Sequence, residues 1–311
     1  MEVNRRARLP GLVRSLAIVD RFAPEGRALR AHLDARLAEP RVASANRFVW
    51  DFWHVPGQYT VLRTPAWTYF PADLYARFHS RLVWWGRRTL GCHDVSPPWL
   101  SIYVDGCGQE LHGDLPHGPW AFVYSLTRWT GRRFRGGETE ILRDEVLDWW
   151  EGFRSTRKAE RPELLRVVAP RFDRLTAFDP RLPHAVRTVR GTLDPREGRV
   201  VVHGWFVSPR PFVEGALDPV ELAPRIDALS DVLLPLAASL PVAGLLSLGF
   251  RVTPGGEVRD ARVLSDTTRA PSGAERERRR LVAAARSHVA AWRFPRRRSP
   301  SRVTLPLVFE R

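Results

Sequence analysis

The spacing of apolar residues in the first 98 positions is helical in two places. Apolar residues recur at helical intervals over 12–38 and over 71–88, and in the second segment Leu74, Phe78 and Leu82 fall on one face. Aromatic residues are concentrated around these segments, namely Phe48, Trp50, Phe52, Trp53, Trp67, Phe70, Trp84 and Trp85. We therefore predict helical, aromatic-rich support over residues 1–98, with these aromatic side chains in the core.

The pattern changes at Trp99 to short runs in which apolar and polar residues alternate. The runs are LSIYVDG, WAFVYSLTRW, LLRVVAP, RLTAFDP and RVVVHGWFV, and turn residues separate them. Short strands divided in this way are typical of an antiparallel barrel or a double-sheet sandwich. Residues 99–212 therefore predict a β core, interrupted by a helical insertion over 144–157 that contains Trp149 and Trp150.

A second domain is predicted after the Pro- and Gly-containing segment SPRPFVEGALDP. We place the first domain at 1–212, a linker at 213–219 and a small α+β domain at 220–311. The expected elements of the small domain are a helix over 220–238, strands over 245–253 and 258–264, a helix from a capping box at Ser272 and Glu275 to Trp292, and a final strand, VTLPLVF.

The composition is that of an ordinary globular protein with an excess of arginine. Hydrophobic residues make up 44% of the chain, and Lys158 is the only lysine among 49 basic residues, which indicates a GC-rich coding bias. The net charge is +15, and residues 251–311 hold 15 arginines against 6 acidic residues, a local net charge of +9. A solvated basic face is therefore the default interpretation. Nucleic acid is not favoured as a partner, and an anionic partner for this tail is the alternative.

Cysteine content and hydropathy favour a cytoplasmic protein without a membrane span. Cys92 and Cys107 have no metal-type or redox spacing and cannot form a disulfide framework, so we expect a reducing compartment. The N-terminal residues lack the apolar core of a signal peptide. The uncharged segment over 232–250 has the length of a span, but Pro235, Pro241 and two glycines interrupt it.

A candidate metal site is formed by His112 and Asp114 together with the distant His184. The first two are separated by Gly113, and on an extended segment residues at this spacing point to one side. His184 lies in FDPRLPHAV, between two predicted strands. Two imidazoles and one carboxylate that leave coordination positions open suit iron(II), which must also hold a bidentate co-substrate and oxygen.

A dicarboxylate co-substrate also requires a cation for its far carboxylate, and arginine provides two parallel hydrogen bonds. On the predicted strand RVVVHGWF, Arg199 has the same facing as His203 and Trp205, so these side chains should enter the barrel together. Arg187 and Arg190 are alternatives, but they lie nearer to His184 and in the expected connecting loop.

Four runs in sequence order resemble the prolyl-hydroxylase-like branch of the iron(II)- and 2-oxoglutarate-dependent oxygenases. They are YVDGCGQELHGDLPHGPWAFVYSLTRW, FRGGETEIL, RLTAFDPRLPHAVRTV and GRVVVHGWF, and they cover about 100–206. The resemblance implies a mainly β domain, a double-stranded β-helix or jelly roll. It also implies that His112, Asp114 and His184 bind Fe(II), that Arg199 anchors 2-oxoglutarate with Tyr103 nearby, and that O2 is the oxidant.

The resemblance also bears on the reaction and the substrate. Halogenating relatives lack the carboxylate, so the presence of Asp114 favours hydroxylation or another oxidation. The expected activity is that of a dioxygenase that hydroxylates a peptide, a protein side chain or a peptide-like metabolite. His203 and Trp205, from the facing of their strand, are candidates for the substrate pocket. Further candidates are His117, which could equally be a surface histidine, and Tyr124, which could equally be a core residue.

The segment over 240–309 resembles the C-terminal domain of TonB-like proteins. The matching features are the strand GLLSLGFRV, the turn PGGE, the return strand, a helix ending in Trp-x-Phe-Pro, and the final strand. In that family the domain binds partners, often by adding a strand to a sheet edge. The membrane anchor of the energy transducers is absent from this sequence, so we interpret the domain as a recruitment module, or alternatively as a structural cap.

A second class of function follows from this basic C-terminal domain. The chain could be a non-catalytic binding protein on an oxygenase fold, in which the TonB-like domain recruits a protein or nucleic-acid partner. Docking of the basic tail on RNA or ribosomes is a third, minor hypothesis. Iron affinity discriminates between the enzyme and the other two.

Overall fold

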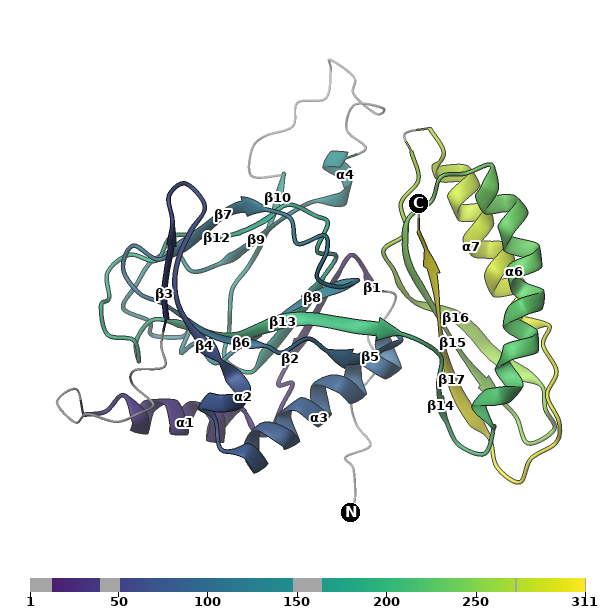
Figure 1. The fold of residues 1–311 in the computed structure, drawn as a ribbon, viewed down its shortest axis with the longest axis horizontal. Helices are drawn as coiled ribbons and strands as arrows, with labels where there is room; N and C mark the ends of the chain where they lie inside the picture. Colours follow the sequence, from purple (N-terminus) through teal and green to yellow (C-terminus); the bar gives the residue numbers. More distant parts are fainter. Residues whose placement is uncertain (1–12, 40–50, 148–163, 272, 311) are drawn as a thin grey trace. The chain divides into compact units, whose positions relative to one another are not determined.

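The structure, a computed structural model, describes residues 13–39, 51–147, 164–271 and 273–310 (Figure 1). Two compact units are formed. One contains Leu16–Val83 and Val95–Val207, and the other contains Trp84–Asp94, Ser208–Arg311 and the N-terminal segment that ends at Ser15. The domain limits predicted above, with a linker at 213–219, remain a prediction.

The first unit is built on eight strands that follow one another along the chain. They are β6 (Trp99–Tyr103), β7 (Gly108–His112), β8 (Trp120–Ser125), β9 (Thr139–Leu142), β10 (Leu165–Val168), β11 (Arg174–Phe178), β12 (His184–Val186) and β13 (Arg199–Pro209). They pair in two sets of four, in the orders β6-β13-β8-β11 and β10-β9-β12-β7. This arrangement is a jelly roll, so the predicted mainly β fold is confirmed, and we call this part the jelly-roll unit.

The two four-stranded sets are joined into one curled sheet by β4 (Tyr59–Pro65), which pairs with both β6 and β7. The strand β3 (Asp51–Val55) forms an antiparallel hairpin with β4, and β2 (Leu16–Asp20) extends the other end of the sheet beside β11. β5 (Cys92–Val95) pairs with β13. The curled sheet encloses the space in which the candidate site lies.

The helices α1 (Gly26–Arg36), α2 (Ala66–Tyr69) and α3 (Ala72–Thr89) support this sheet (Figure 1). α3 coincides with the helix predicted over 71–88, and Leu74, Phe78 and Leu82 are buried as expected from their spacing. Phe78 packs against Tyr124 of β8, with the ring centres 4.7 Å apart. The helix predicted over 71–88 is therefore present, but the prediction that the surrounding aromatic residues lie in the core is wrong for Phe52 and Trp67, which are 65% and 40% exposed.

The prediction of helix over 12–38 is wrong in its first half. Residues 16–20 form β2, because they pair with all five residues of β11, and the helix α1 begins only at Gly26. The insertion over 144–157 is described only in α4 (Asp144–Leu147). Phe48, Trp50, Trp149 and Trp150 lie outside the described residues.

The second unit, called the C-terminal unit, contains a five-stranded sheet in the order β1-β16-β15-β17-β14. The strands are β1 (Val13–Arg14), β14 (Phe212–Glu214), β15 (Gly244–Val252), β16 (Val258–Asp266) and β17 (Ser301–Phe309). The helices α6 (Ala223–Ala238) and α7 (Glu275–Ala290) cover one face of it (Figure 1). The predicted small α+β arrangement is confirmed, and its TonB-like character stays a prediction.

The helix starts in the C-terminal unit differ from the prediction. α7 begins at Glu275 with Ala274 as its N-cap residue, whose side chain makes no capping hydrogen bond, and Ser272 lies outside the described residues. A capping box is instead present at Asp218 and Glu221, where it opens the short 3-10 helix η3 (Pro219–Leu222) ahead of α6. Among the described residues, no helix is long and apolar enough to cross a membrane.

Candidate metal centre

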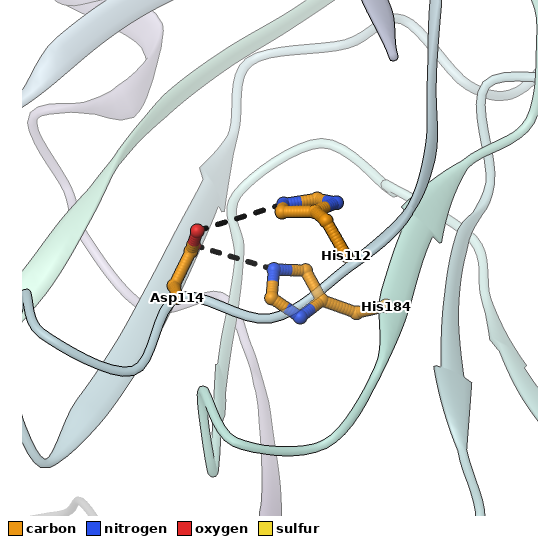
Figure 2. A group of neighbouring side chains, drawn as sticks. All are labelled: His112, Asp114 and His184. Carbon is orange, nitrogen blue, oxygen red and sulfur yellow. Dashed lines mark ion pairs between the residues drawn. The ribbon is translucent and has the colours of Figure 1, made fainter. Parts of the chain in front are cut away.

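His112, Asp114 and His184 come together at the junction of two paired strands (Figure 2). His112 is the last residue of β7 and His184 the first of β12, and the two are direct partners in the antiparallel register. Asp114 follows β7 by two residues, and its backbone N–H donates to the carbonyl oxygen of Pro180 at 2.9 Å. The register and this hydrogen bond place all three side chains on one side of the sheet.

The ligand atoms of the three side chains converge on one point. Asp114 Oδ1 lies 3.6 Å from His112 Nε2, and Asp114 Oδ2 lies 3.3 Å from His184 Nε2. The carboxylate faces both rings in Figure 2. The histidine ring centres are 4.2 Å apart, and all three ligand atoms lie within 4.8 Å of one another. One cation could therefore contact two imidazole nitrogens and a carboxylate oxygen together.

Both imidazoles are oriented by the backbone. The Nδ1 atom of His112 lies 2.8 Å from the carbonyl oxygen of Glu110, and that of His184 lies 2.9 Å from the carbonyl oxygen of Leu182. A carbonyl oxygen can only accept, so each Nδ1 carries the hydrogen and each Nε2 presents its lone pair. Two lone pairs aimed at a carboxylate form a donor set suited to a cation, and backbone partners of this kind orient histidine ligands in metal proteins.

The charge states of the site agree with this orientation. Burial and the neighbouring His184 lower the pKa of His112, which favours its neutral ring. Burial alone would raise the pKa of Asp114, but the interaction with His184, whose ring donates to the carboxylate when it is protonated, outweighs it, so the pKa lies below its usual value. At neutral pH the site thus holds an ionised carboxylate beside a neutral imidazole, which are the protonation states that a metal requires.

Gln109 is a neighbour that the sequence analysis gave no role. Its side-chain amide nitrogen lies 2.9 Å from His112 Nε2, so it donates to the lone pair that a metal would use. The position of Gln109 three residues before His112 is not a recognisable signal in the sequence. We infer that this amide turns away when His112 binds a cation.

Arg199 lies almost completely buried at the start of β13, with 1% of its surface exposed. Its Nη2 donates to Thr139 Oγ1 at 3.2 Å, and its guanidinium carbon lies 4.5 Å from the ring centre of Tyr103. Nε and Nη1 have no hydrogen-bond partner among the residues that the structure describes. Burial lowers the pKa of Arg199, yet a guanidinium stays charged in proteins. A buried cation with two unpartnered donor nitrogens fits an anionic ligand.

Arg199, Tyr103 and the three candidate ligands line one cavity of about 500 Å³. His203, Trp205 and His117 also line it, as the facing of β13 predicted for the first two. His203 Nε2 lies 2.8 Å from Ser101 Oγ, and the His117 ring packs on Trp205 with the centres 4.4 Å apart. Burial, reinforced by the charge of Arg199, lowers the pKa of His203 to about 3, so its ring is neutral at neutral pH.

Tyr124, the weakest of the sequence candidates, does not line this cavity. Its ring is fully buried against Phe78 of α3, and its hydroxyl donates to Asp173 Oδ1 at 2.8 Å. Val123, the preceding residue on β8, faces the cavity instead. Of the two interpretations given for Tyr124, core packing is therefore the one that its surroundings support.

The backbone conformation of the turn at Gly136 and Gly137 requires glycine. Both residues have positive φ angles, of 77° and 80°. A Cβ atom on Gly136 would lie 2.0 Å from the carbonyl oxygen of Thr188, so only glycine fits there. The turn brings Thr139 of β9 to the guanidinium of Arg199.

The β4 strand forms a wall of the cavity that was not predicted from the sequence. Tyr59, Val61 and Arg63 alternate along this strand, and all three line the cavity. Trp99 of β6 lies beside Arg63, whose guanidinium carbon is 4.4 Å from its ring centre. The alternation of these residues is typical of a strand. It was not interpreted in this way because it lies within residues 1–98, for which helical support was predicted.

No protein-family model matches the sequence, and no curated protein shows significant similarity to it. Several solved structures are similar in fold. A Pseudomonas putida prolyl-4-hydroxylase shares 17% identity, with a TM-score of 0.43 over 62% of this chain and 92% of that one. An oxidoreductase of the 2OG-Fe(II) oxygenase family from Burkholderia pseudomallei shares 16%, with a TM-score of 0.37 over 61% and 84%. Function is therefore inferred from the residues of this chain.

Proposed function

We propose that this chain is an iron(II)- and 2-oxoglutarate-dependent oxygenase. The observation that carries the proposal is one cavity that holds both the His112–Asp114–His184 set and the unpartnered guanidinium of Arg199. A metal site alone would fit many proteins. A buried anion site in the same cavity fits a co-substrate that has one end on the metal and a carboxylate at the other.

Each residue has a role defined by its surroundings. His112, Asp114 and His184 would hold the metal through two neutral imidazoles and one carboxylate, leaving positions for the co-substrate and oxygen. Arg199 would bind the far carboxylate through Nη1, one of its two nitrogens that make no hydrogen bond within the described chain. Thr139 and Tyr103 hold the guanidinium in place for this contact.

Bound iron(II) would supply the activation of oxygen, coupled to the oxidative decarboxylation of 2-oxoglutarate to succinate. The contribution of the protein is to orient the reactants and to exclude water. The wall contains Val61, Phe122, Val123, Phe178 and Val201, which offer no hydrogen bonds from their side chains. Burial lowers the pKa of His203 to about 3, so its ring is uncharged and only weakly basic at neutral pH. The site is thus suited to removal of hydrogen from a C–H bond rather than to acid–base catalysis.

The finer prediction concerns the product and the substrate. The presence of Asp114 supports hydroxylation over halogenation, as inferred from the sequence. We propose a peptide, a protein side chain or a peptide-like metabolite as the substrate, reached through the open side of the cavity. The non-catalytic alternative leaves the convergence of the three ligand atoms on one point unexplained.

The test measures metal binding and turnover separately. The apoprotein is loaded with iron(II) under argon, 2-oxoglutarate is added, and the visible charge-transfer absorption of the iron–2-oxoacid chelate is recorded. Succinate is then measured after admission of air. We expect both signals in the wild type. In Asp114→Ala and His112→Ala, we expect iron affinity to fall by about 100-fold or more, because even the outer partners of metal ligands contribute about 10- to 100-fold.

His117→Ala is the matched control, because it removes an imidazole that lines the same cavity but lies on Trp205 and outside the metal-ligand cluster. It should keep the iron affinity and the chelate absorption of the wild type. Equal iron affinity in the wild type and Asp114→Ala would contradict the metal site. Iron binding without chelate absorption or succinate formation would contradict the oxygenase.

A further inference from the structure

The cavity contains a second cation, Arg63, which the proposed reaction does not use. Arg63 is half-buried on β4 and lines the cavity. Its guanidinium carbon lies 3.5 Å from the ring centre of Trp53 and 4.4 Å from that of Trp99. The contacts with two aromatic rings hold the side chain in a fixed direction and allow it to be partly desolvated.

Arg63 is not neutralised by the described part of the protein. It forms no ion pair with a described residue, and its Nε is buried without a hydrogen-bond partner there. Asp51 is its direct partner in the β3–β4 register, but this carboxylate is exposed and makes no ion pair with it. Burial lowers the pKa of Arg63, which is the direction expected for a cation without a close counter-charge.

The hydrogen-bonding capacity of the cavity is one-sided. Among the described residues that line it, the buried side-chain polar atoms without a partner are Nε of Arg63, Nε and Nη1 of Arg199, and Nε1 of Trp205. All of these atoms are donors. Outside the metal-ligand cluster, whose carboxylate and imidazole nitrogens accept, a wall whose free buried groups only donate is complementary to a ligand rich in acceptors, such as an oxyanion.

The two arginines start from separate positions on the wall, although both influence the pKa of Tyr103. Arg199 is opposite Tyr103 in the β13–β6 register, whereas Arg63 is opposite Ser101 in the β4–β6 register. Their backbones are two strands and two residues apart, or about 12 Å from the usual spacings of a sheet. The dicarboxylate proposed above accounts for Arg199 and leaves Arg63 without an anion.

We propose that Arg63, held by Trp53 and Trp99, binds an anionic group, a carboxylate or a phosphate, on the primary substrate. The term primary substrate rests on the proposed oxygenase function, but the anion site itself does not. The site selects substrates that carry a negative group beside the C–H bond to be oxidised. A neutral molecule of the same shape would leave the guanidinium buried and unpaired, which weakens its binding.

The test uses small probes and neither metal nor 2-oxoglutarate. N-acetylglycine, methyl phosphate and the neutral N-acetylglycinamide are each titrated into the protein by calorimetry. We expect N-acetylglycine or methyl phosphate to bind at least about 10-fold more tightly than the neutral amide, which is the usual gain from a hydrogen bond to a charged group. The tighter of the two acids identifies the class of anion. Equal affinity for the acids and the amide in the wild type would overturn the proposal.

Substitutions test whether Arg63 causes the preference for the acid over the neutral amide. Arg63→Gln should bind acid and amide equally, and Arg63→Lys should keep part of the preference and guards against a folding defect. Arg132→Gln is the matched control. The guanidinium carbon of Arg132 lies 3.6 Å from the ring centre of Trp129, but Arg132 does not line the cavity. It should behave as the wild type. Full retention of the preference in Arg63→Gln would place the anion elsewhere and overturn the proposal.

Two further measurements separate this site from the co-substrate site. Arg199→Met should keep the preference for the acid, and Arg63→Gln should bind iron(II) and 2-oxoglutarate as the wild type does. If Arg63→Gln no longer binds 2-oxoglutarate, the two arginines share one anion site, which would contradict the proposal. The same holds if Arg199→Met loses the preference for the acid while Arg63 is intact. If the wild type fails to bind iron but prefers the acid, the oxygenase assignment fails and the anion site stands.

Discussion

Two buried arginines, one in each unit, show how differently the same side chain can be used. Arg199 of the jelly-roll unit has 1% of its surface exposed and Arg278 of the C-terminal unit 4%. Arg278 Nη1 donates to Asp266 Oδ2 at 2.7 Å and to Thr268 Oγ1 at 2.8 Å. Its Nε and Nη2 donate to the carboxylate of Glu275 at 2.7 and 2.9 Å. By contrast, Nε and Nη1 of Arg199 have no hydrogen-bond partner within the described chain, and Nη2 donates to Thr139.

The pKa shifts of the two arginines run in opposite directions for this reason. The hydrogen bonds that Arg278 donates to Glu275 raise the pKa of Arg278 and outweigh its burial, with Asp266 adding to the effect. Burial dominates for Arg199 and lowers its pKa, although Tyr103 and Glu138 partly offset it. Burial of a charge therefore does not identify a functional site. A buried charge whose hydrogen-bonding groups stay free does, because folding alone gives no reason to keep it.

The largest effect that follows from the comparison is on stability. Arg278→Met leaves Asp266 buried without its partner, and we expect the free energy of unfolding to fall by about 3 kcal/mol. Urea denaturation followed by far-UV circular dichroism measures it. Arg279→Met is the control, because Arg279 bonds the same Glu275 from a side chain that is 71% exposed, and it should change little. Equal effects of the two substitutions would show that burial of the pair is unimportant.

Arg199→Met should weaken ligand binding and leave stability unchanged, which is the opposite of Arg278→Met. It removes an unpaired buried charge, so the unfolding free energy without ligand should not fall, whereas 2-oxoglutarate affinity should fall by about 100-fold or more. Calorimetric titration of the metal-loaded protein gives the affinity. Arg187→Met is the control, since Arg187 is half-exposed and bonds Glu140 outside the cavity. A destabilised Arg199→Met variant with unchanged 2-oxoglutarate affinity would make Arg199 a structural residue like Arg278.

The smallest expected effect is a loss of stability of the C-terminal unit at acid pH. The hydrogen bond from Arg278 lowers the pKa of Glu275 to about 2, below its usual value near 4.5. A carboxyl group with a depressed folded pKa stabilises the protein above its unfolded pKa, and this contribution is lost as pH falls from 4.5 towards 2. The Glu275 side chain is 40% exposed, so we expect less than about 1 kcal/mol. Glu275→Gln should flatten the unfolding free energy over this range, and an unchanged pH slope would contradict the assignment.

The strand period of two accounts for the part of the site that was predictable. It placed Arg199, His203 and Trp205 on one face of β13, and all three line the cavity. The chain order of Tyr103, His112, Asp114, His184 and Arg199 is likewise a local property that can be read without a structure. The roles assigned to these residues remain predictions until metal and co-substrate binding are measured.

The parts that could not be predicted depend on pairing between distant segments. Leu16 to Asp20 read as part of a helix because the apolar spacing is ambiguous over five residues, and only the pairing with β11 settles it as a strand. Arg63 was missed because its surroundings come from β3, β4 and β6 together. Tyr124 could not be assigned to core or cavity because the hydroxyl partner, Asp173, lies 49 positions away.

The backbone hydrogen bonds of His112 and His184 have a consequence for metal selectivity. Glu110 and Leu182 orient both rings in advance, so apart from displacing the Gln109 amide the metal has little to reorganise when it binds. A site that is ready-made accepts any divalent ion of suitable size, and such sites bind cobalt, nickel and copper more tightly than iron. Under the proposed function, the metal that is bound therefore depends on which ion the cell supplies. Copper or nickel would displace iron and inactivate the enzyme without unfolding it.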